Sequence, residues 1–417
     1  MSEHHRLDPL VVLNDPATVR RRCHAITAAV ESGHSAHFRL DRGALPAIAR
    51  RIAALTRRRF PDLQIPYHSR WRHFEAGGVD RKDEIDALLR PLGSAGLARA
   101  RIDLALISVL LDAGAGPDWH YDEAETGQRL ARSEGLAVAT LRAFAAGAFS
   151  SRPDEPCRVD ARALGRMEAA PLAAVFQVRP DNPLVGLEGR AALLRRLGAV
   201  MAAQPERFGD DGRPGGLFDR LAARARQRSS TAPALQAAEL LVELLASLAP
   251  IWPSGQSLDG RPIGDVWPHP QASAPDAPAA GRVPFHKLSQ WLTYSLLEPF
   301  EWAGIAVEGL DALTGLPEYR NGGLLIDGGA LVPLAADFAA RPRTVDDPWV
   351  IEWRALTVAL LDDLAPLVRA ELGVDAQQLP LACMLEGGSW AAGREIAAER
   401  RPGGAPPLRI ASDGTVF

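Results

Sequence analysis

Apolar residues recur at helical spacing along most of this chain. Within residues 44–60, four apolar side chains would share one face of a helix whose other face carries arginines, namely Leu45, Ile48, Ile52 and Leu55. Similar periodicity predicts helices over residues 89–113, 133–149, 189–203, 232–248, 285–302 and 348–372. Alanine is abundant in these segments and favours helix more than any other residue. The pattern therefore predicts a mainly α-helical fold with few strands.

Residues 319–334 carry the clearest strand pattern. Two turn-like steps, Asn321-Gly322-Gly323 and Asp327-Gly328-Gly329, flank an apolar run at 324–326. Asn-Gly and Asp-Gly steps accept the positive backbone dihedrals of tight hairpin turns, so we expect a small β-hairpin here. Residues 252–284 are rich in Pro, Gly and Ser without a helical period, and we expect a long loop there.

Length and charge limit the classes of partner. The 417 residues suffice for one large or two ordinary domains. Lys and Arg number 47 against 51 Asp and Glu, a formal net charge of -4, so we expect neither nucleic acid nor membrane as a partner. No apolar run approaches the roughly 18 residues of a spanning helix, the N-terminal residues lack a signal-peptide core, and the three cysteines lie far apart. These features favour a cytoplasmic protein.

Sequence motifs for common cofactors are absent. Neither the phosphate-binding pattern GxxxxGK[ST] nor the dinucleotide pattern GxGxxG occurs. Nitrogen ligands could come from two histidine pairs, His34 with His37 and His68 with His73. No cysteine pair or HExxH motif accompanies either pair. We therefore expect neither a metal nor a cofactor.

The segment 66–75 combines three aromatic and four potentially cationic side chains. Aromatic faces stack on planar ligands, and arginine forks onto carboxylate or phosphate oxygens. Arg70, Trp71, His73 and Phe74 are therefore candidate ligand contacts. The alternative is a surface segment whose aromatic residues anchor it to the core.

The predicted helix 285–302 carries a polar stripe of Lys287, Gln290, Tyr294, Glu298 and Glu301. A solvated helix face would explain the stripe. The helix is otherwise apolar all round, however, so the alternative is a buried helix whose polar stripe faces a cavity.

Two further clusters contain a glutamate. Glu318, Tyr319 and Arg320 lie at the mouth of the expected hairpin, where a turn could present them to a ligand or where Glu318 could simply pair with Arg320. Glu352 opens the helix 348–372 among large apolar neighbours and precedes Arg354 by two residues. It is either a desolvated carboxylate with a chemical role or a charge that stabilises the helix dipole.

Four stretches resemble a known family. They are IPYHSRWRHFEAGG at 65–78, RSEGLA at 132–137, FHKLSQWLTY at 285–294 and SDGTVF at 412–417. On these motifs the chain resembles the uracil-catabolism family of yeasts and many bacteria, nearly from end to end, which implies one family unit over 1–417. In that family's pathway a cyclohydrolase-like partner opens the uracil ring, and the family is thought to act on the ribosylurea species that results.

A more distant resemblance is to the queuosine-salvage nucleotide glycosylases. Their Phe-Tyr-Lys-Arg-Ala-Gln, Ala-Asp-Tyr-Arg and Glu-Ile-Arg motifs correspond in order to FHKLSQ at 285–290, PEYR at 317–320 and EWR at 352–354, and GRAALL at 189–194 resembles another of their helices. The resemblance implies a multi-helix fold similar to DNA glycosylases, with residues 79–180 as an enlarged helical insertion. It also implies that Glu318 stands where those enzymes carry their catalytic aspartate.

These resemblances suggest hydrolysis of the N-glycosidic bond of ribosylurea or its 5'-phosphate. Such a reaction passes through an oxocarbenium-like state and needs a carboxylate beside the anomeric carbon, a base for water and help for the departing nitrogen. We assign the first two roles to Glu318 and orientation of the sugar to Glu352. The expected substrate contacts are Arg70, Trp71, His73, Phe74, Lys287, Tyr294, Glu301, Tyr319, Arg320 and Arg354.

Two other functions remain open on the sequence. A metal-dependent amidohydrolase would attack the urea carbonyl instead of the glycosidic bond. A non-catalytic protein of the same pathway would bind the ribosyl compound without turnover and channel it between pathway enzymes.

Overall fold

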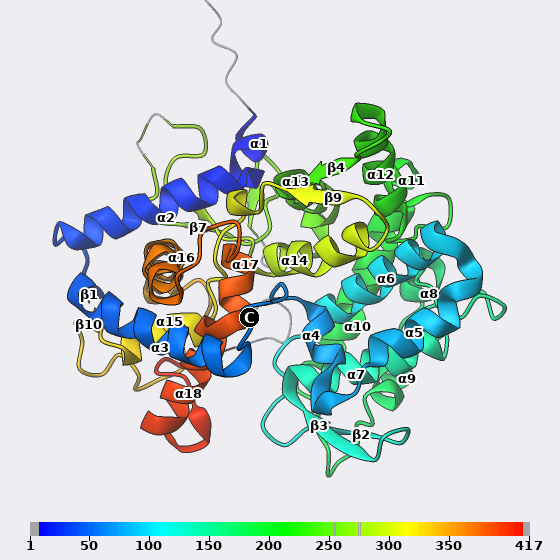
Figure 1. Ribbon diagram of the computed structural model, residues 1–417, viewed down its shortest axis with the longest axis horizontal. Helices are drawn as coiled ribbons and strands as arrows, with labels where there is room; N and C mark the ends of the chain where they lie inside the picture. The colour runs from blue at the N-terminus through cyan, green and yellow to red at the C-terminus, as the bar shows by residue number, and fades with distance from the viewer. Residues whose placement is uncertain (1–7, 253–255, 274, 276, 412–417) are drawn as a thin grey trace, which may run out of the picture. The chain divides into compact units, whose positions relative to one another are not determined.

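The computed structural model describes residues 8–252, 256–273, 275 and 277–411, so the motif at 412–417 lies outside the described residues. Helices dominate, and the strands form small two-stranded sheets (Figure 1). The mainly α-helical prediction is thus confirmed. Two compact units divide the chain: the first contains described residues within 1–68, 256–290 and 309–411, and the second those within 69–255 and 291–308.

The first unit is built around one long helix. Its helices are α1 (Pro9–Asn14), α2 (Pro16–Glu31), η1 (Arg42–Ala44), α3 (Leu45–Arg59), η5 (Leu310–Ala312), α15 (Tyr319–Asp327), α16 (Pro348–Leu372), α17 (Leu381–Met384), the π-helical turn η6 (Leu385–Ser389), α18 (Trp390–Arg400) and η7 (Pro402–Gly404). Its strands are β1 (Phe38–Leu40), β5 (Ser257–Leu258), β6 (Arg261–Pro262), β7 (Val266–Pro268), β8 (Arg282–Pro284) and β10 (Leu331–Pro333). They pair antiparallel as β1 with β10, β5 with β6 and β7 with β8.

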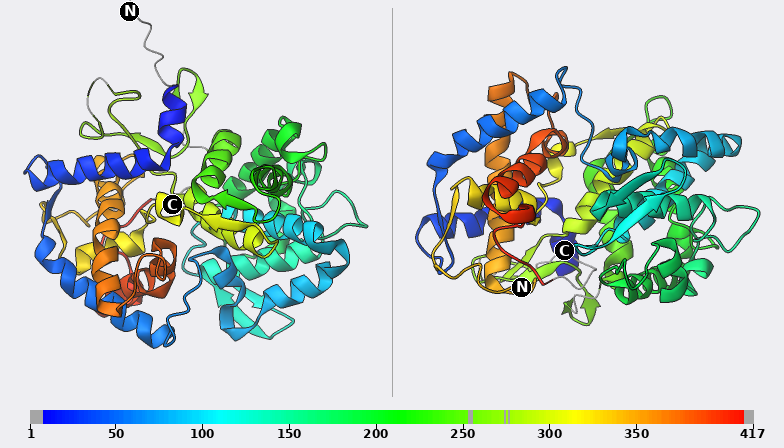
Figure 2. Two further views of the ribbon diagram at one scale, coloured as in Figure 1. Left: turned by 45° about the horizontal axis from the view of Figure 1, so that its top comes forward. Right: turned by 90° about the horizontal axis from the view of Figure 1, so that it is seen from below.

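Helix α16 spans the predicted segment and is held by strong local signals. The Asp347 side chain accepts the Trp349 backbone N–H at its start, Pro348 takes the first helical position, and Gly373 ends the helix at φ 72. The helix contacts α2, α3 and α15 and is seen end-on in Figure 1; in Figure 2 it crosses α2. A cluster of fully buried apolar residues joins α2, the β7–β8 sheet and α16. This helix is therefore the scaffold of the first unit.

The expected hairpin at 319–334 is wrong, because most of this segment is the helix α15. Glu318 caps its first turn, which satisfies N–H groups that a hairpin would leave to a partner strand. A Cβ on Gly322 would lie 2.6 Å from the Trp353 ring, so this glycine permits close helix packing instead of a turn. Only Leu331–Pro333 forms a strand, β10, and it pairs with β1. The described part of the expected loop at 252–284 contains the β5–β6 and β7–β8 pairs.

The second unit is a separate helical assembly. Its helices are α4 (Arg70–Phe74), η2 (Ala76–Gly78), α5 (Arg81–Leu89), η3 (Arg90–Leu92), α6 (Gly93–Leu110), α7 (Arg132–Ala145), α8 (Ala161–Gly165), α9 (Ala169–Val175), α10 (Leu187–Ala202), α11 (Pro205–Phe208), α12 (Gly216–Arg228), α13 (Ala237–Leu248) and η4 (Ala249–Ile251). Strands β2 (His120–Glu123) and β3 (Gln128–Ala131) pair antiparallel, and β4 (Ala234–Gln236) pairs parallel with β9 (Ala306–Glu308). Residues 79–180 thus supply α5 to α9 of this unit.

Helix α14 (Lys287–Glu301) begins in the first unit and continues in the second. It confirms the helix expected at 285–302. Three residues of its polar stripe, Gln290, Tyr294 and Glu298, are buried. The solvated-face reading of the stripe is therefore incorrect. Gln290 shows how one of them is satisfied, since its side chain both donates to and accepts from Thr314, at 2.5 and 3.0 Å.

Candidate functional site

Glu318 stands immediately before α15 in the first unit and caps it. Its Oε2 accepts the backbone N–H of Arg320 and its Oε1 that of Asn321, each at 2.6 Å. Only 8% of the residue is exposed. Burial raises the pKa of this carboxyl above its ordinary value, although the two N–H donors and the charges of Lys287 and His68 act in the opposite direction. The result is a carboxyl group that is held in one orientation and keeps its proton to a higher pH than an exposed glutamate does.

Lys287 is the first residue of α14, and a buried ion pair fixes its backbone. Its N–H donates to Asp265 Oδ2 over 3.1 Å. Asp265 also accepts two contacts from Arg354, at 2.8 and 2.6 Å, and one from Trp267 Nε1 at 2.6 Å. Burial opposes ionisation of Asp265, but the Arg354 charge and these hydrogen bonds hold its pKa at about 2. Arg354 is thereby engaged in anchoring the start of α14 to α16.

Tyr319 and Arg320 differ in exposure. Arg320 Nη1 donates to the Gly404 carbonyl at 2.8 Å, and its guanidinium lies 4.9 Å from the centroid of the Tyr319 ring. Arg320 is 6% exposed, whereas Tyr319 is 36% exposed. Glu318 binds the backbone N–H of Arg320, so the cap replaces the side-chain ion pair considered above.

Glu352 lies in the first turns of α16 and is buried. The Ser35 hydroxyl donates to its Oε1, and His269 Nε2 lies 3.7 Å from its Oε2. Ser35 in turn accepts the backbone N–H groups of His37 and Phe38 at 2.9 and 3.0 Å. The expectation of a desolvated carboxylate at this position agrees with its burial.

A histidine and a glutamate that the sequence did not single out as a pair meet in the first unit. His68 Nδ1 lies 2.9 Å from Glu386 Oε2, and Arg59 Nη2 binds Glu386 Oε1 at 2.8 Å. His68 is also one of the charges that act on Glu318. The histidine lies inside the segment 66–75 noted above, but Glu386 is 318 residues away. No local pattern could have found the pair.

Asn321 and Trp353 carry buried polar atoms next to the two candidate glutamates. Neither the amide atoms of Asn321 nor Nε1 of Trp353 finds a hydrogen-bond partner among the described residues, and both residues are 1% exposed. Asn321 lies in the first turn after Glu318, and Trp353 follows Glu352. Because buried polar groups are normally paired, these atoms are candidate contacts for a polar ligand.

Three of the candidates on α4, Arg70, Trp71 and Phe74, are core residues of the second unit, whereas His73 is half-buried. Arg70 is fully buried, with Nε donating to Ser108 at 2.7 Å and Nη1 lying 3.1 Å from Asp112. Trp71 Nε1 donates to the Ser295 carbonyl at 2.8 Å. The Trp71 ring makes edge contacts with the Phe74 and Trp302 rings. Packing thus engages Trp71 and Phe74, as the anchoring alternative expected.

Glu298 is a second buried carboxyl group, in the second unit. Ser69 donates to its Oε2 at 2.6 Å and Arg72 to its Oε1 at 2.9 Å. Burial raises its pKa, against the Arg72 charge and the Ser69 hydrogen bond. On the same helix, Tyr294 is fully buried and Glu301 is half-buried.

The ring of His73, on α4, stands perpendicular to the ring of Trp291, on α14, with 5.8 Å between the ring centroids.

The sequence candidates form two groups. Lys287, Glu318, Tyr319, Arg320, Glu352 and Arg354 belong to the first unit; Arg70, Trp71, His73, Phe74, Tyr294 and Glu301 belong to the second.

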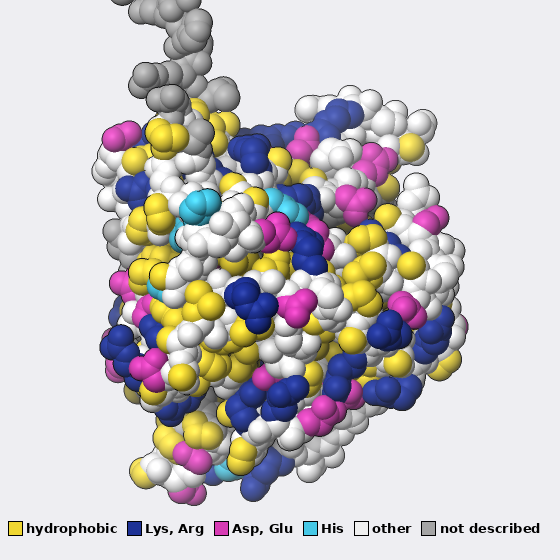
Figure 3. Space-filling view, turned by 90° about the vertical axis from the view of Figure 1, so that its left-hand side faces the viewer, with side chains coloured by type: hydrophobic (Ala, Val, Ile, Leu, Met, Phe, Trp, Pro, Cys, Tyr) yellow, Lys and Arg dark blue, Asp and Glu magenta, His cyan; other side chains and the backbone are white. Residues whose placement is uncertain are grey.

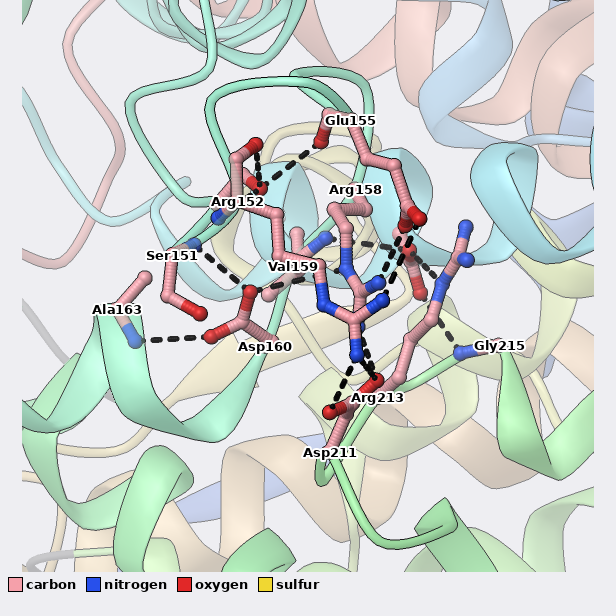
Figure 4. A network of polar contacts seen from close by, with 12 residues as sticks. Ser151, Arg152, Glu155, Arg158, Val159, Asp160, Ala163, Asp211, Arg213 and Gly215 are labelled. Atoms are coloured by element: carbon pink, nitrogen blue, oxygen red, sulfur yellow. Dashed lines mark hydrogen bonds and ion pairs between the residues drawn. The ribbon is translucent and has the colours of Figure 1, made fainter.

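An open groove of about 860 Å³ lies in the second unit and is lined by Arg99, Arg152, Arg158, Arg207, Arg213, Arg220 and Arg224, among others. Ion pairs engage these guanidinium groups. Arg152 and Arg158 share Asp211, at 2.8 and 2.9 Å (Figure 4). The remaining arginines pair with Asp103, Asp219 and Glu243. Because each of these arginines is already engaged in an ion pair with a carboxylate, we do not assign the groove to an anionic ligand.

Acidic and basic side chains are interspersed on the face shown in Figure 3. Over the described ranges, no three His, Cys, Asp or Glu side chains are grouped so that they could hold a metal ion. In the same part of the chain, no helix combines the length and apolar character needed to cross a membrane.

Comparison with known proteins gives matches over nearly the whole chain. Residues 12–417 match the family described as protein of unknown function (DUF1688). The chain is 40% identical over 407 residues to "Protein urg3" of Schizosaccharomyces pombe, covering 96% of each chain. It is 37% identical over 442 residues to "Uracil catabolism protein 4" of Lachancea kluyveri, covering 98% of this chain and 99% of the other. The protein described here therefore belongs to the DUF1688 family.

Proposed function

We propose that this protein acts in uracil catabolism as an N-ribohydrolase that releases urea from ribosylurea or its 5'-phosphate. The observation that carries the proposal is the buried Glu318 carboxyl group, which two backbone N–H groups hold at the start of α15. The similarity to "Uracil catabolism protein 4" of Lachancea kluyveri supports the pathway.

Glu318 suits the central demand of this reaction. As the bond from the anomeric carbon to the urea nitrogen breaks, positive charge develops on the sugar, and a fixed carboxylate stabilises it without reorganising. The same carboxylate can take a proton from the attacking water. Its pKa, raised by burial, makes it a stronger base than an exposed glutamate once it is ionised.

The first unit offers further groups for binding. Lys287 acts electrostatically on Glu318, and we assign its ammonium group to a ribose hydroxyl or the 5'-phosphate. The buried amide of Asn321 and Nε1 of Trp353 can bind polar atoms of the substrate. Glu352 retains the role of orienting the sugar hydroxyls. Arg320 and Arg354 support this arrangement through Gly404 and Asp265.

The test is an incubation of the purified full chain with ribosylurea and, separately, with its 5'-phosphate. Free urea together with ribose or ribose phosphate is the expected result. Release of ammonia without urea would identify an amidohydrolase. Saturable binding of either compound in calorimetry, with no product, would identify a binding or channelling protein and overturn the proposed reaction.

A further inference from the structure

His68 and Glu386 form a buried pair in which the histidine has one fixed orientation. The backbone N–H of His68 donates to the Ala382 carbonyl at 3.0 Å, and its Nδ1 lies 2.9 Å from Glu386 Oε2. His68 is 8% exposed, and its ring centroid lies 6.3 Å from that of Trp390. The contacts with Glu386 and Trp390 therefore limit the rotation of the imidazole.

Glu386 is held by an unusual backbone element. It lies in the π-helical turn between α17 and α18, and such turns are frequent at functional sites. A Cβ on Gly388 would lie 2.6 Å from the Ile52 carbonyl of α3, so glycine is needed for this turn to pack there. Burial opposes ionisation of Glu386, but the hydrogen bond from His68 and the charge of Arg59 lower its pKa. Glu386 is therefore a carboxylate at neutral pH.

An ionised carboxylate can only accept hydrogen bonds, so Nδ1 of His68 donates the hydrogen bond to Glu386. With Nδ1 engaged by Glu386, the other ring nitrogen, Nε2, is the one from which a proton can be given to a substrate. The charged groups around His68 are Glu386 on the π-helical turn, Arg59 on α3 and Glu318 before α15. The His68 ring lies beside Trp390, the first residue of α18, and α18 packs against α15, the helix that Glu318 caps. The imidazole and the Glu318 carboxyl group therefore lie in the same part of the first unit.

We infer that His68 is the proton donor to the departing urea nitrogen and that Glu386 is the residue that positions it. The inference rests on the proposed function and supplies the third requirement of that reaction, help for the leaving group. The bond between the anomeric carbon and nitrogen breaks, and that nitrogen receives the Nε2 proton of His68. Water forms the new carbon–oxygen bond and gives a proton to Glu318. Solvent then returns this proton to His68, so the sum is ribosylurea plus water giving ribose and urea.

The test compares two leaving groups, urea and 4-nitrophenolate, which departs without needing a proton. His68→Gln is expected to reduce kcat for ribosylurea by roughly a hundred- to ten-thousand-fold, the usual contribution of a general acid. Its kcat for 4-nitrophenyl riboside should stay within a few-fold of wild type. Glu318→Gln should reduce both, because the developing cation forms with either leaving group.

A matched control is His24→Gln, since His24 also pairs with a carboxylate, Asp362, at 3.1 Å. It should leave both rates unchanged. Glu386→Gln should cause a smaller loss on ribosylurea and alter the alkaline limb of the pH profile, with partial recovery in Glu386→Asp. Equal losses on both substrates in His68→Gln, or an unchanged rate on ribosylurea, would overturn this inference and leave the proposed function standing. If the wild type releases urea from neither substrate form, the proposed function falls and this inference falls with it.

Discussion

Replacing Glu318 by glutamine tests the central residue of the proposed reaction. The change removes the charge but keeps the length of the side chain. Loss of one preorganised electrostatic partner costs about 2.7–4 kcal/mol in the activation barrier, or roughly a hundred- to a thousand-fold in turnover. We therefore expect urea release to fall by that factor.

The same change also disturbs a helix cap. Two backbone N–H groups, from Arg320 and Asn321, now find carboxylate oxygens at 2.6 Å. Glutamine offers only one oxygen, so one donor would face the amide nitrogen of glutamine instead. Loss of a cap costs about 0.5–2 kcal/mol of stability, partly offset here because a neutral amide is easier to bury than a carboxylate. Folding should therefore survive the change.

The assay measures urea release and thermal unfolding on the same preparation. Asp160→Asn is the matched control, because Asp160 caps α8 of the second unit, where its carboxylate accepts the backbone N–H groups of Ser151 at 2.8 Å and Ala163 at 3.0 Å, and no residue assigned to the proposed site lies on that helix. Both variants should unfold at a moderately lower temperature, and only Glu318→Gln should lose turnover. Glu318→Asp should be milder, although it retracts the carboxylate by one methylene. Near wild-type turnover in Glu318→Gln would refute the assignment, and Glu352 or Glu301 would become the next carboxylate to test.

Further outcomes are expected for the pKa of Glu318, for the Asp265–Arg354 pair and for treatment with a chelator. The acid limb of the kcat/KM profile should lie at higher pH than for an exposed glutamate, because burial raises the pKa of Glu318 and only its ionised form acts. This limb should move in Glu318→Asp. A kcat/KM profile without an acid limb would contradict the assignment. Because the pKa of Glu318 is raised in the folded state, protonation of this carboxyl group favours folding. Its contribution to stability should therefore decline as the pH rises through the pKa of the folded state. Asp265→Asn should cost about 3–5 kcal/mol in chemical denaturation, since it leaves the buried Arg354 charge without its partner; a loss under 1 kcal/mol would show that the pair is dispensable. The contribution of Asp265 in the wild type should be lost only as the pH falls towards about 2. Turnover should survive a chelator, because the proposed groups act through charge and proton transfer, and activity restored by zinc after chelation would favour an amidohydrolase.

Much of the helical fold followed from the sequence, because helical periodicity is a local property. The segment 348–372 was predicted with the bounds of α16, and 44–60 and 285–302 each differ from α3 and α14 by only one or two residues at an end. Strong caps and long apolar stripes make these helices insensitive to the rest of the chain. The role of Glu318 as a helix cap was not predicted, because the segment that follows it was expected to be a hairpin.

Tertiary packing decided what the local pattern left ambiguous. The glycines of 321–329 resemble turn residues in sequence, yet Gly322 serves to bring α15 against Trp353 of α16, and a helix forms. The partner of His68 could likewise not be predicted from the sequence. Glu386 is 318 residues away and is brought to the imidazole by the π-helical turn after α17. Long-range pairs of this kind depend on where whole helices meet. The sequence could therefore indicate candidate residue types for the site, while the packing of helices determined which of them lie together.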